Sequence, residues 1–294
     1  MTDRFEADRQ KIEARLDQVC ESYVAGIPGD VADAIRYGLK SPGKRLRPLL
    51  LLYAYRAAGG ADDASLLACA PEVVHSYSLM HDDLPCMDDD DMRRGRPTVH
   101  KVYGLKVAIL GGIAMIPLAA MVVRNAIGEM GLRAEVGRAI LETVWRAGGS
   151  RGMIGGQERD LAAEGLSLAI EEREALHSAK TGALIAGSLR MGGLAASATA
   201  GQMQALDRFG RDIGLAFQIM DDVLDVTSTT TALGKTTGRD AVLGKSTYPA
   251  LLGVDGAQRR AQTLIDDGLE SLRSCGLLTQ ELSQVANFIV TRTS

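Results

Sequence analysis

The 294-residue chain has 46% hydrophobic residues, enough for a sizeable core, and only 4% aromatic residues. Its net charge of −4 argues against a general nucleic-acid-binding protein. The four cysteines show no metal-finger or disulfide spacing, and the charged N-terminal segment has no signal-peptide core, so a cytoplasmic setting is expected.

Apolar residues recur with a helical period along almost the whole chain, and convincing strand patterns are absent. Several segments are apolar on most faces, as expected for helices inside a bundle. We therefore predict an all-α fold: a single large bundle of about ten or more helices around a central active-site cavity, with residues 1–294 forming one domain. The predicted helices cover residues 3–25, 29–39, 45–59, 63–87, 104–127, 133–148, 150–164, 171–195, 200–228, 246–252, 255–274 and 279–292.

One uncharged run, Val107 to Val123, has the composition of a membrane span. Its length only reaches the lower limit for crossing a bilayer, and Gly111, Gly112 and Pro117 interrupt it. We expect a buried core helix and no stable membrane insertion.

The first aspartate cluster, Asp82, Asp83 and Asp88, stands in an otherwise apolar stretch. Carboxylates among core-type residues are costly unless a cation compensates them. Because Pro85 prevents an ordinary helical turn, Asp88 is expected to reach back from a distorted helix end. Asp89 to Asp91 are expected to be mostly solvated or capping residues, and direct metal contact is the alternative.

The second cluster, Asp221, Asp222 and Asp225, lies on a predicted helix, where Gln218 joins the same polar stripe. Neither cluster has a matching run of lysines beside it. Hard divalent ions such as Mg²⁺ take oxygen ligands and share them with substrate phosphates. The two clusters therefore predict a site that holds Mg²⁺ against a polyphosphate.

Separate basic groups are placed for phosphate binding, since arginine forks match phosphate geometry and lysines act as point charges. Together with the acidic clusters they suggest two anionic groups, one bridged by metal and one held by side chains. The basic groups are Lys44-Arg45-Leu46-Arg47, Arg93-Arg94, Lys180-Thr181, Lys235 and Lys245.

With these motifs the sequence resembles the trans-isoprenyl diphosphate synthases, or polyprenyl synthetases, over nearly its whole length. The markers are Gly43-Lys44-Arg45-Leu46-Arg47-Pro48, His81-Asp82-Asp83-Leu84-Pro85-Cys86-Met87-Asp88, Arg93-Arg94-Gly95-Arg96-Pro97-Thr98, Gly155-Gly156-Gln157 with Asp160, Lys180-Thr181-Gly182, Phe217-Gln218-Ile219-Met220-Asp221-Asp222 and Gly244-Lys245-Ser246-Thr247-Tyr248-Pro249.

The resemblance implies a role for each matching residue. Two Mg²⁺ ions would be held by Asp82 and Asp88 and a third by Asp221, with waters held by Asp83, Asp222 and Asp225. The allylic diphosphate would be gripped by Arg93, Lys180 and Lys235. The diphosphate of isopentenyl diphosphate would be bound by Lys44, Arg47, His75 and Arg94, with Lys245 a further phosphate ligand. The developing allylic cation would face the Thr181 hydroxyl and the Gln218 carbonyl.

Product length is expected to depend on the residues just before Asp82. Tyr77, with Ser78 beside it and two extra residues inside the motif, resembles bacterial farnesyl diphosphate synthases; an ordinary core tyrosine is the alternative. Most relatives carry Gly-Asp-Ala-Leu where this chain has Gly111-Gly112-Ile113-Ala114. The missing acidic residue, and a helix kink expected at Pro117, leave the tunnel shape open.

The resemblance implies a Mg²⁺-dependent prenyltransferase, by family a homodimer, that joins dimethylallyl or geranyl diphosphate to isopentenyl diphosphate. Farnesyl diphosphate is the expected product, and geranylgeranyl diphosphate is the alternative. A terpene cyclase usually has an Asn-Ser-Glu type of second metal site and needs no pocket for a second substrate. A catalytically silent partner subunit would be expected to lose acidic motif residues, which are intact here, although Gly112 keeps this alternative open.

Overall fold

The computed structural model describes residues 3–163, 170–227 and 247–292, so Lys235 and Lys245 lie outside the described residues. The chain divides into two compact units, which are described separately. Unit 1 contains Met1–Leu52 and Ala61–Leu141, and unit 2 contains Tyr53–Gly60 and Glu142–Ser294. That residues 1–294 act as one domain stays a prediction.

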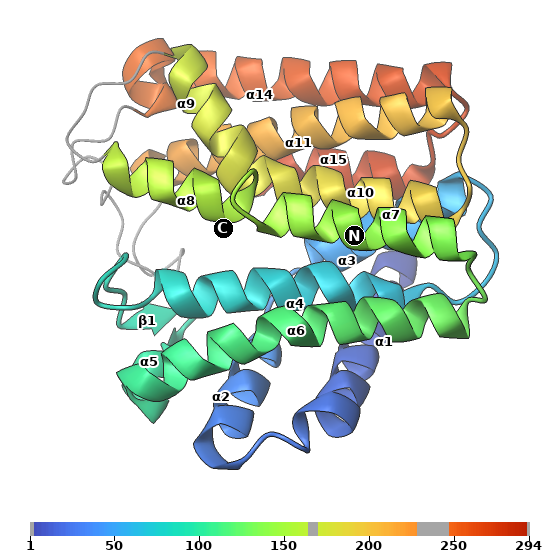
Figure 1. Cartoon of the computed structure of the whole chain (residues 1–294). Coiled ribbons are helices and arrows are strands. Elements are labelled where there is room, and N and C mark those ends of the chain that lie inside the picture. The colour runs from blue at the N-terminus through green and yellow to red at the C-terminus, as the bar shows by residue number, and fades with distance from the viewer. Residues whose placement is uncertain (1–2, 164–169, 228–246, 293–294) are drawn as a thin grey trace. The chain divides into compact units, whose positions relative to one another are not determined.

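Unit 1 is built around α4, which packs against α1, α2 and α6 (Figure 1). Most of α4 is buried, which agrees with its nearly continuous apolar sequence. The elements are α1 (Asp3–Val19), the π-helix η1 (Cys20–Val24), α2 (Gly29–Leu39), α3 (Leu46–Ala57, which crosses the unit boundary), α4 (Ser65–Asp82), β1 (Met92–Arg93), β2 (Arg96–Pro97), α5 (Val99–Tyr103) and α6 (Leu105–Glu129).

Unit 2 is built around α11, which packs against α10, α14, α15 and the π-helix η2. Gly253, which has a φ of 70°, interrupts the helical conformation of α14 near its start. The elements are α7 (Ala134–Gly148, shared with unit 1), α8 (Met153–Ala162), α9 (Ile170–His177), η2 (Ser178–Gly182), α10 (Ala183–Ala195), α11 (Ala200–Thr227), α14 (Tyr248–Ser274) and α15 (Gln280–Thr291).

The all-α prediction is confirmed, because helices make up all but a two-stranded hairpin of the regular structure in the described residues. In that hairpin Met92 pairs with Pro97 and Arg93 with Arg96. Arg94 and Gly95, the two loop residues, both have positive φ, as a type I′ hairpin turn requires. Gly95 was the available signal for this turn, but the flanking strands are too short to show an alternating pattern.

α6 is only half buried, which corrects the prediction of a buried core helix for Val107 to Val123. It is one unbroken helix through Pro117. By length and composition alone it could cross a membrane, and 44% of its most apolar stretch of 18 residues is buried. One face packs on α4 and α2, whereas Leu110, Ile113 and Met121 on another face are 43%, 53% and 45% exposed. Trp145 on α7, the chain's single tryptophan, is also exposed.

Candidate active site

The first aspartate segment starts where α4 ends. Asp82 is the last helical residue, and the helix stops before the predicted residue 87 because Pro85 cannot continue its hydrogen bonding. The backbone N–H of Asp88 donates to the Asp82 carbonyl at 2.8 Å, and that of Asp89 donates to the Leu84 carbonyl at 3.1 Å. The predicted return of Asp88 to a distorted helix end is confirmed.

Asp83 is buried and paired with Arg93. Arg93 Nε lies 2.5 Å from Asp83 Oδ1, and Arg93 Nη2 lies 3.3 Å from Asp90 Oδ2. Burial raises the pKa of Asp83 to about 6 against the opposing charge of Arg93. The pair ties the end of α4 to the hairpin. The metal role of Asp83 and the diphosphate role of Arg93 stay predictions, and Arg93 would have to exchange carboxylates for phosphate.

Several arginines act electrostatically on His75, which lies on α4. Burial and the positive charges of Arg47 and Arg94 lower the pKa of His75 well below its usual value, so the ring is neutral at pH 7. Desolvation also lowers the pKa of Arg94, and the charge of Arg45 acts in the same direction. The structure thus brings Arg94 to the segment that carries Lys44 and Arg47, because Arg94 Nη1 donates to the Pro42 carbonyl at 2.8 Å. Lys44 is exposed just before α3.

Arg45 does not belong to the phosphate-binding group that the sequence suggested. Its Nη1 forms a buried ion pair with Glu72 Oε1 at 2.7 Å, and its Nη2 donates to the carbonyls of Leu39 and Ser41. Arg45 therefore fastens the α2–α3 connection to α4. No sequence pattern predicts this ion pair, because Glu72 is 27 residues away along the chain.

The residues predicted to set product length lie on the buried side of α4. Tyr77 is 7% exposed and meets the ring of His81 edge to face, with centroids 5.9 Å apart. Ser78 Oγ donates to the His75 carbonyl. The His81 ring also fills the space that a side chain at Gly112 would need, because a Cβ there would lie 2.8 Å from His81 Cε1. Gly112 and His81 are therefore packed as a pair.

In unit 2, Asp221 lies on α11 and is held by an arginine that the sequence analysis missed. Arg292 Nη2 lies 2.6 Å from Asp221 Oδ1 and donates to the Phe217 carbonyl at 2.9 Å. The guanidinium stacks on the Phe217 ring, 3.9 Å from its centroid. The Asp221 side chain remains 40% exposed, and Gln218 Nε2 donates to its other oxygen at 3.4 Å.

Asp222 departs from the predicted polar stripe. Its carboxylate is buried, where Oδ2 pairs with Arg173 Nη2 at 3.2 Å and accepts the Tyr248 backbone N–H at 3.0 Å. Asp222 thereby joins α11 to α9 and α14. Its neighbour along the stripe, Asp225, is half-buried. The metal-associated roles that the resemblance implies for Asp222 and Asp225 stay predictions.

Lys180 and Thr181 lie in the π-helix η2, a local distortion that often marks functional sites. Lys180 Nζ lies 2.6 Å from Asp160 Oδ2 on α8. The two segments approach closely at Gly156, where a Cβ would lie 2.5 Å from Lys180 Cα. The Gly-Gly-Gln marker therefore includes a glycine that packing requires.

Gln157 is a candidate site residue to which the sequence analysis gave no role. It is 7% exposed, and neither its Oε1 nor its Nε2 has a hydrogen-bond partner among the described residues. Buried amide groups normally have partners, so water or a ligand is expected there. Its place beside Gly156 in a marker motif was the available signal.

Comparison with known sequences identifies a family that spans most of the chain. The family model described as polyprenyl synthetase matches residues 29–276. A farnesyl diphosphate synthase of Escherichia coli is 41% identical over 296 residues, covering 96% of this chain and 98% of the relative. A dimethylallyltranstransferase of Fischerella ambigua is 40% identical, covering 97% and 82%.

Solved structures agree as well. An FPP/GFPP synthase of Zymomonas mobilis has a TM-score of 0.86 at 32% identity, covering 98% of this chain and 100% of that one. A geranyltransferase of Helicobacter pylori, complexed with magnesium and isoprenyl diphosphate, has a TM-score of 0.85 at 30% identity, covering 99% of each chain. The fold and motifs define a prenyltransferase of the short-chain trans type. The chain belongs to the polyprenyl synthetase family.

Proposed function

We propose that the protein condenses dimethylallyl or geranyl diphosphate with isopentenyl diphosphate in a Mg²⁺-dependent reaction that gives farnesyl diphosphate. The observation that carries this proposal is a second group of cations, in which Arg94 Nη1 donates to the Pro42 carbonyl at 2.8 Å next to the segment of Lys44 and Arg47. The charges of Arg47 and Arg94 also act on the ring of His75. Such a group favours an anion other than the metal-bound one, as a two-substrate condensation requires and a cyclisation does not. Relatives named farnesyl diphosphate synthase support the product.

The residues for Mg²⁺ are suitable in type and accessibility. Asp82 and Asp88 are half-buried at neighbouring positions of one folded segment, and the Asp221 carboxylate is partly exposed. Carboxylates are the ligands that Mg²⁺ prefers. When bound, the ions, which we propose to be three, neutralise the leaving diphosphate. The magnesium complex of the Helicobacter pylori geranyltransferase supports this cofactor.

The chain's own residues would orient the substrates and stabilise developing charge. Breaking the allylic C1–O bond leaves its electron pair on diphosphate, which Arg93 and Lys180 would bind. The Thr181 hydroxyl oxygen and the Gln218 carbonyl would face the allylic cation. His75 and the neighbouring arginines would hold isopentenyl diphosphate while its alkene attacks C1, and the released diphosphate would accept the final proton. Preorganised groups of this kind typically contribute ~10²–10³ each in turnover.

Tyr77 is proposed to limit the product to fifteen carbons. Its ring is buried and packs edge to face against His81, so it would hold a fixed position at the end of the tunnel for the growing product. Tyr77→Ala should lengthen the product toward geranylgeranyl diphosphate, detected by mass. Tyr53→Ala, which removes a buried tyrosine on α3 outside this pair, is the matched control. An unchanged product from Tyr77→Ala would remove Tyr77 from chain-length control.

We also propose a homodimer in the cytoplasm, with the apolar face of α6 as the contact. The exposed side chains of Leu110, Ile113 and Met121 support it, since exposed apolar faces of this kind mark interaction sites. Sedimentation should give twice the chain mass for the wild type and a smaller particle for Ile113→Glu. A wild-type monomer would contradict this contact.

The reaction is tested by incubating the purified chain with isopentenyl diphosphate, Mg²⁺ and each allylic primer in turn, followed by mass analysis. Farnesyl diphosphate formed by the chain alone is the expected result. A geranylgeranyl product would revise the chain length. Consumption of the allylic substrate without isopentenyl diphosphate would indicate a cyclase. No consumption by the folded protein would indicate a silent subunit and overturn the proposal.

A further inference from the structure

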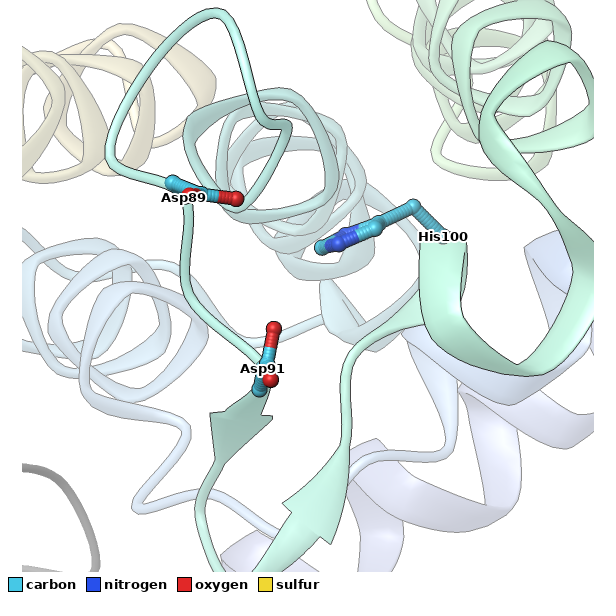
Figure 2. Close-up of side chains that lie close together, drawn as sticks. All are labelled: Asp89, Asp91 and His100. Carbon is cyan, nitrogen blue, oxygen red and sulfur yellow. The ribbon is translucent and has the colours of Figure 1, made fainter.

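Three side chains of unit 1 outside the proposed Mg²⁺ set form a compact group of potential metal ligands. A carboxylate oxygen of Asp89, one of Asp91 and a ring nitrogen of His100 all lie within 4.8 Å of one another. Figure 2 shows the imidazole of His100 pointing toward the space between the two aspartates. Asp89 and Asp91 are exposed, whereas His100 is only 7% exposed.

The hydrogen bonds of Thr98 determine which nitrogen of His100 carries a proton. Thr98 Oγ1 lies 2.8 Å from the Asp90 carbonyl and 3.3 Å from the Asp91 carbonyl, so its single hydrogen is donated to the backbone. Thr98 Oγ1 must then accept a hydrogen bond from His100 Nδ1, which lies 3.1 Å away.

The Nε2 of His100 is therefore left with a lone pair. This atom is buried and has no hydrogen-bond partner among the described residues. Metal-bound histidines characteristically donate their other ring N–H to an oxygen in this way. A buried acceptor without a partner is also costly unless a water or an ion satisfies it. The Thr98–His100 pair thus has the geometry of a ligand with its supporting hydrogen bond.

The charges near the ring suit a cation. Desolvation and Lys101 lower the pKa of His100, which keeps the imidazole neutral as a metal ligand requires, while Asp91 and Asp89 act in the opposite direction. Lys101 Nζ lies 2.7 Å from Asp91 Oδ1 and compensates one carboxylate. Both groups of this pair are exposed, so the lysine can yield to a bound ion.

We propose that Asp89, Asp91 and His100 bind a borderline divalent transition ion, for which Zn²⁺ is the probe. One imidazole and two carboxylates with room for water match the open sites of such ions. Mg²⁺ prefers oxygen ligands alone, so His100 separates this site chemically from the proposed Mg²⁺ site.

The test is a titration of Zn²⁺ into the full chain in excess Mg²⁺, in a Cys86→Ser background because that thiol is exposed. Ring resonances of the four histidines are followed by NMR, and affinity is measured against a chelating dye. The His100 signal should shift in step with one Zn²⁺ per chain. Asp89→Asn and Asp91→Asn, both exposed changes, should each weaken this binding at least ~10-fold, the lower bound for losing a supporting group.

Thr98 and Lys101 give matched controls. Thr98→Val should weaken Zn²⁺ binding ~10–100-fold because it removes the acceptor for Nδ1, whereas Thr98→Ser should restore it. Lys101→Met should strengthen binding, because it removes the competing cation. An unshifted His100 resonance, or an affinity that is the same in Asp89→Asn, Asp91→Asn and the parent, would overturn the proposal. Neither result depends on whether the protein forms farnesyl diphosphate.

Discussion

The two aspartate segments are similar in sequence but differ in how the protein neutralises them. In the first, the buried Asp83 is paired with Arg93, only 10 residues away, and the backbone folds into a compact turn. In the second, α11 continues as a regular helix, and the arginines come from 49 and 71 residues away, Arg173 to Asp222 and Arg292 to Asp221. One segment is locally organised, whereas the other depends on the packing of α9, α14 and the chain after α15.

The largest expected effect is on stability, where each unit has a buried ion pair. Removing one partner leaves an unpaired buried charge, which typically costs about 3–5 kcal/mol. Arg173→Leu and Arg45→Leu should each lower the free energy of unfolding by about this amount in urea denaturation. The double change Arg173→Leu with Asp222→Asn should recover much of the loss, since no charge is left unpaired and the amide oxygen can still accept the Tyr248 N–H. A loss under 1 kcal/mol for Arg173→Leu would mean that Asp222 is solvated.

The next effect concerns catalysis. Asp82→Ala and Asp221→Ala should each lower condensation at least ~10²–10³-fold with an unchanged helical CD spectrum, because each removes a proposed metal ligand. Glu135→Ala on α7 and Asp266→Ala on α14 are exposed carboxylate controls that should remain active. Near-normal turnover of either motif variant would refute the metal role at that segment.

The two units also differ, by a smaller amount, in the stability that a Gly→Ala change at a closely packed glycine should cost. A Cβ at Gly156 would overlap the backbone of η2, which cannot move alone, so Gly156→Ala should cost about 1–3 kcal/mol. The three atoms nearest to a Cβ at Gly112 all belong to the His81 side chain, which can change rotamer. Gly112→Ala should therefore cost less. Thermal unfolding measures both, and equal losses would show that the His81 ring is fixed.

The smallest effect is a pH dependence in unit 1. The folded-state pKa of His75 is depressed below its unfolded value of about 6.5, so the unfolded chain binds more protons below that pH. The stabilisation is present above pH 6.5 and is lost as pH falls through it. Asp83, whose pKa is raised to about 6, acts in the opposite direction over the same range, but it does so in both proteins. The stability of the wild type relative to His75→Gln should therefore fall between pH 7.5 and pH 5.5 in denaturation experiments. An equal change in both proteins would assign the pH dependence to other groups.

Local sequence signals predicted most of the helices and the turn after Asp82, because helical periodicity and Pro85 act within a few residues. The positions of the two aspartate segments were also recognised from the sequence. The partners of Asp221 and Asp222 were not, since Arg292 and Arg173 reach them only through tertiary packing. The burial of Asp222 beside a partly exposed Asp221 was not predicted either. Adjacent residues of a helix point ~100° apart, but the predicted polar stripe grouped the two aspartates together.

The exposed position of Trp145 determines how unfolding of this protein can be observed. An indole already in contact with water emits at long wavelength in the native state, and its emission changes little when the chain unfolds. Intrinsic fluorescence would then report mainly on the surface of α7. Circular dichroism would follow the loss of helix instead. The substitution Phe217→Trp, which places an indole beneath the Arg292 guanidinium, would report on the second aspartate segment.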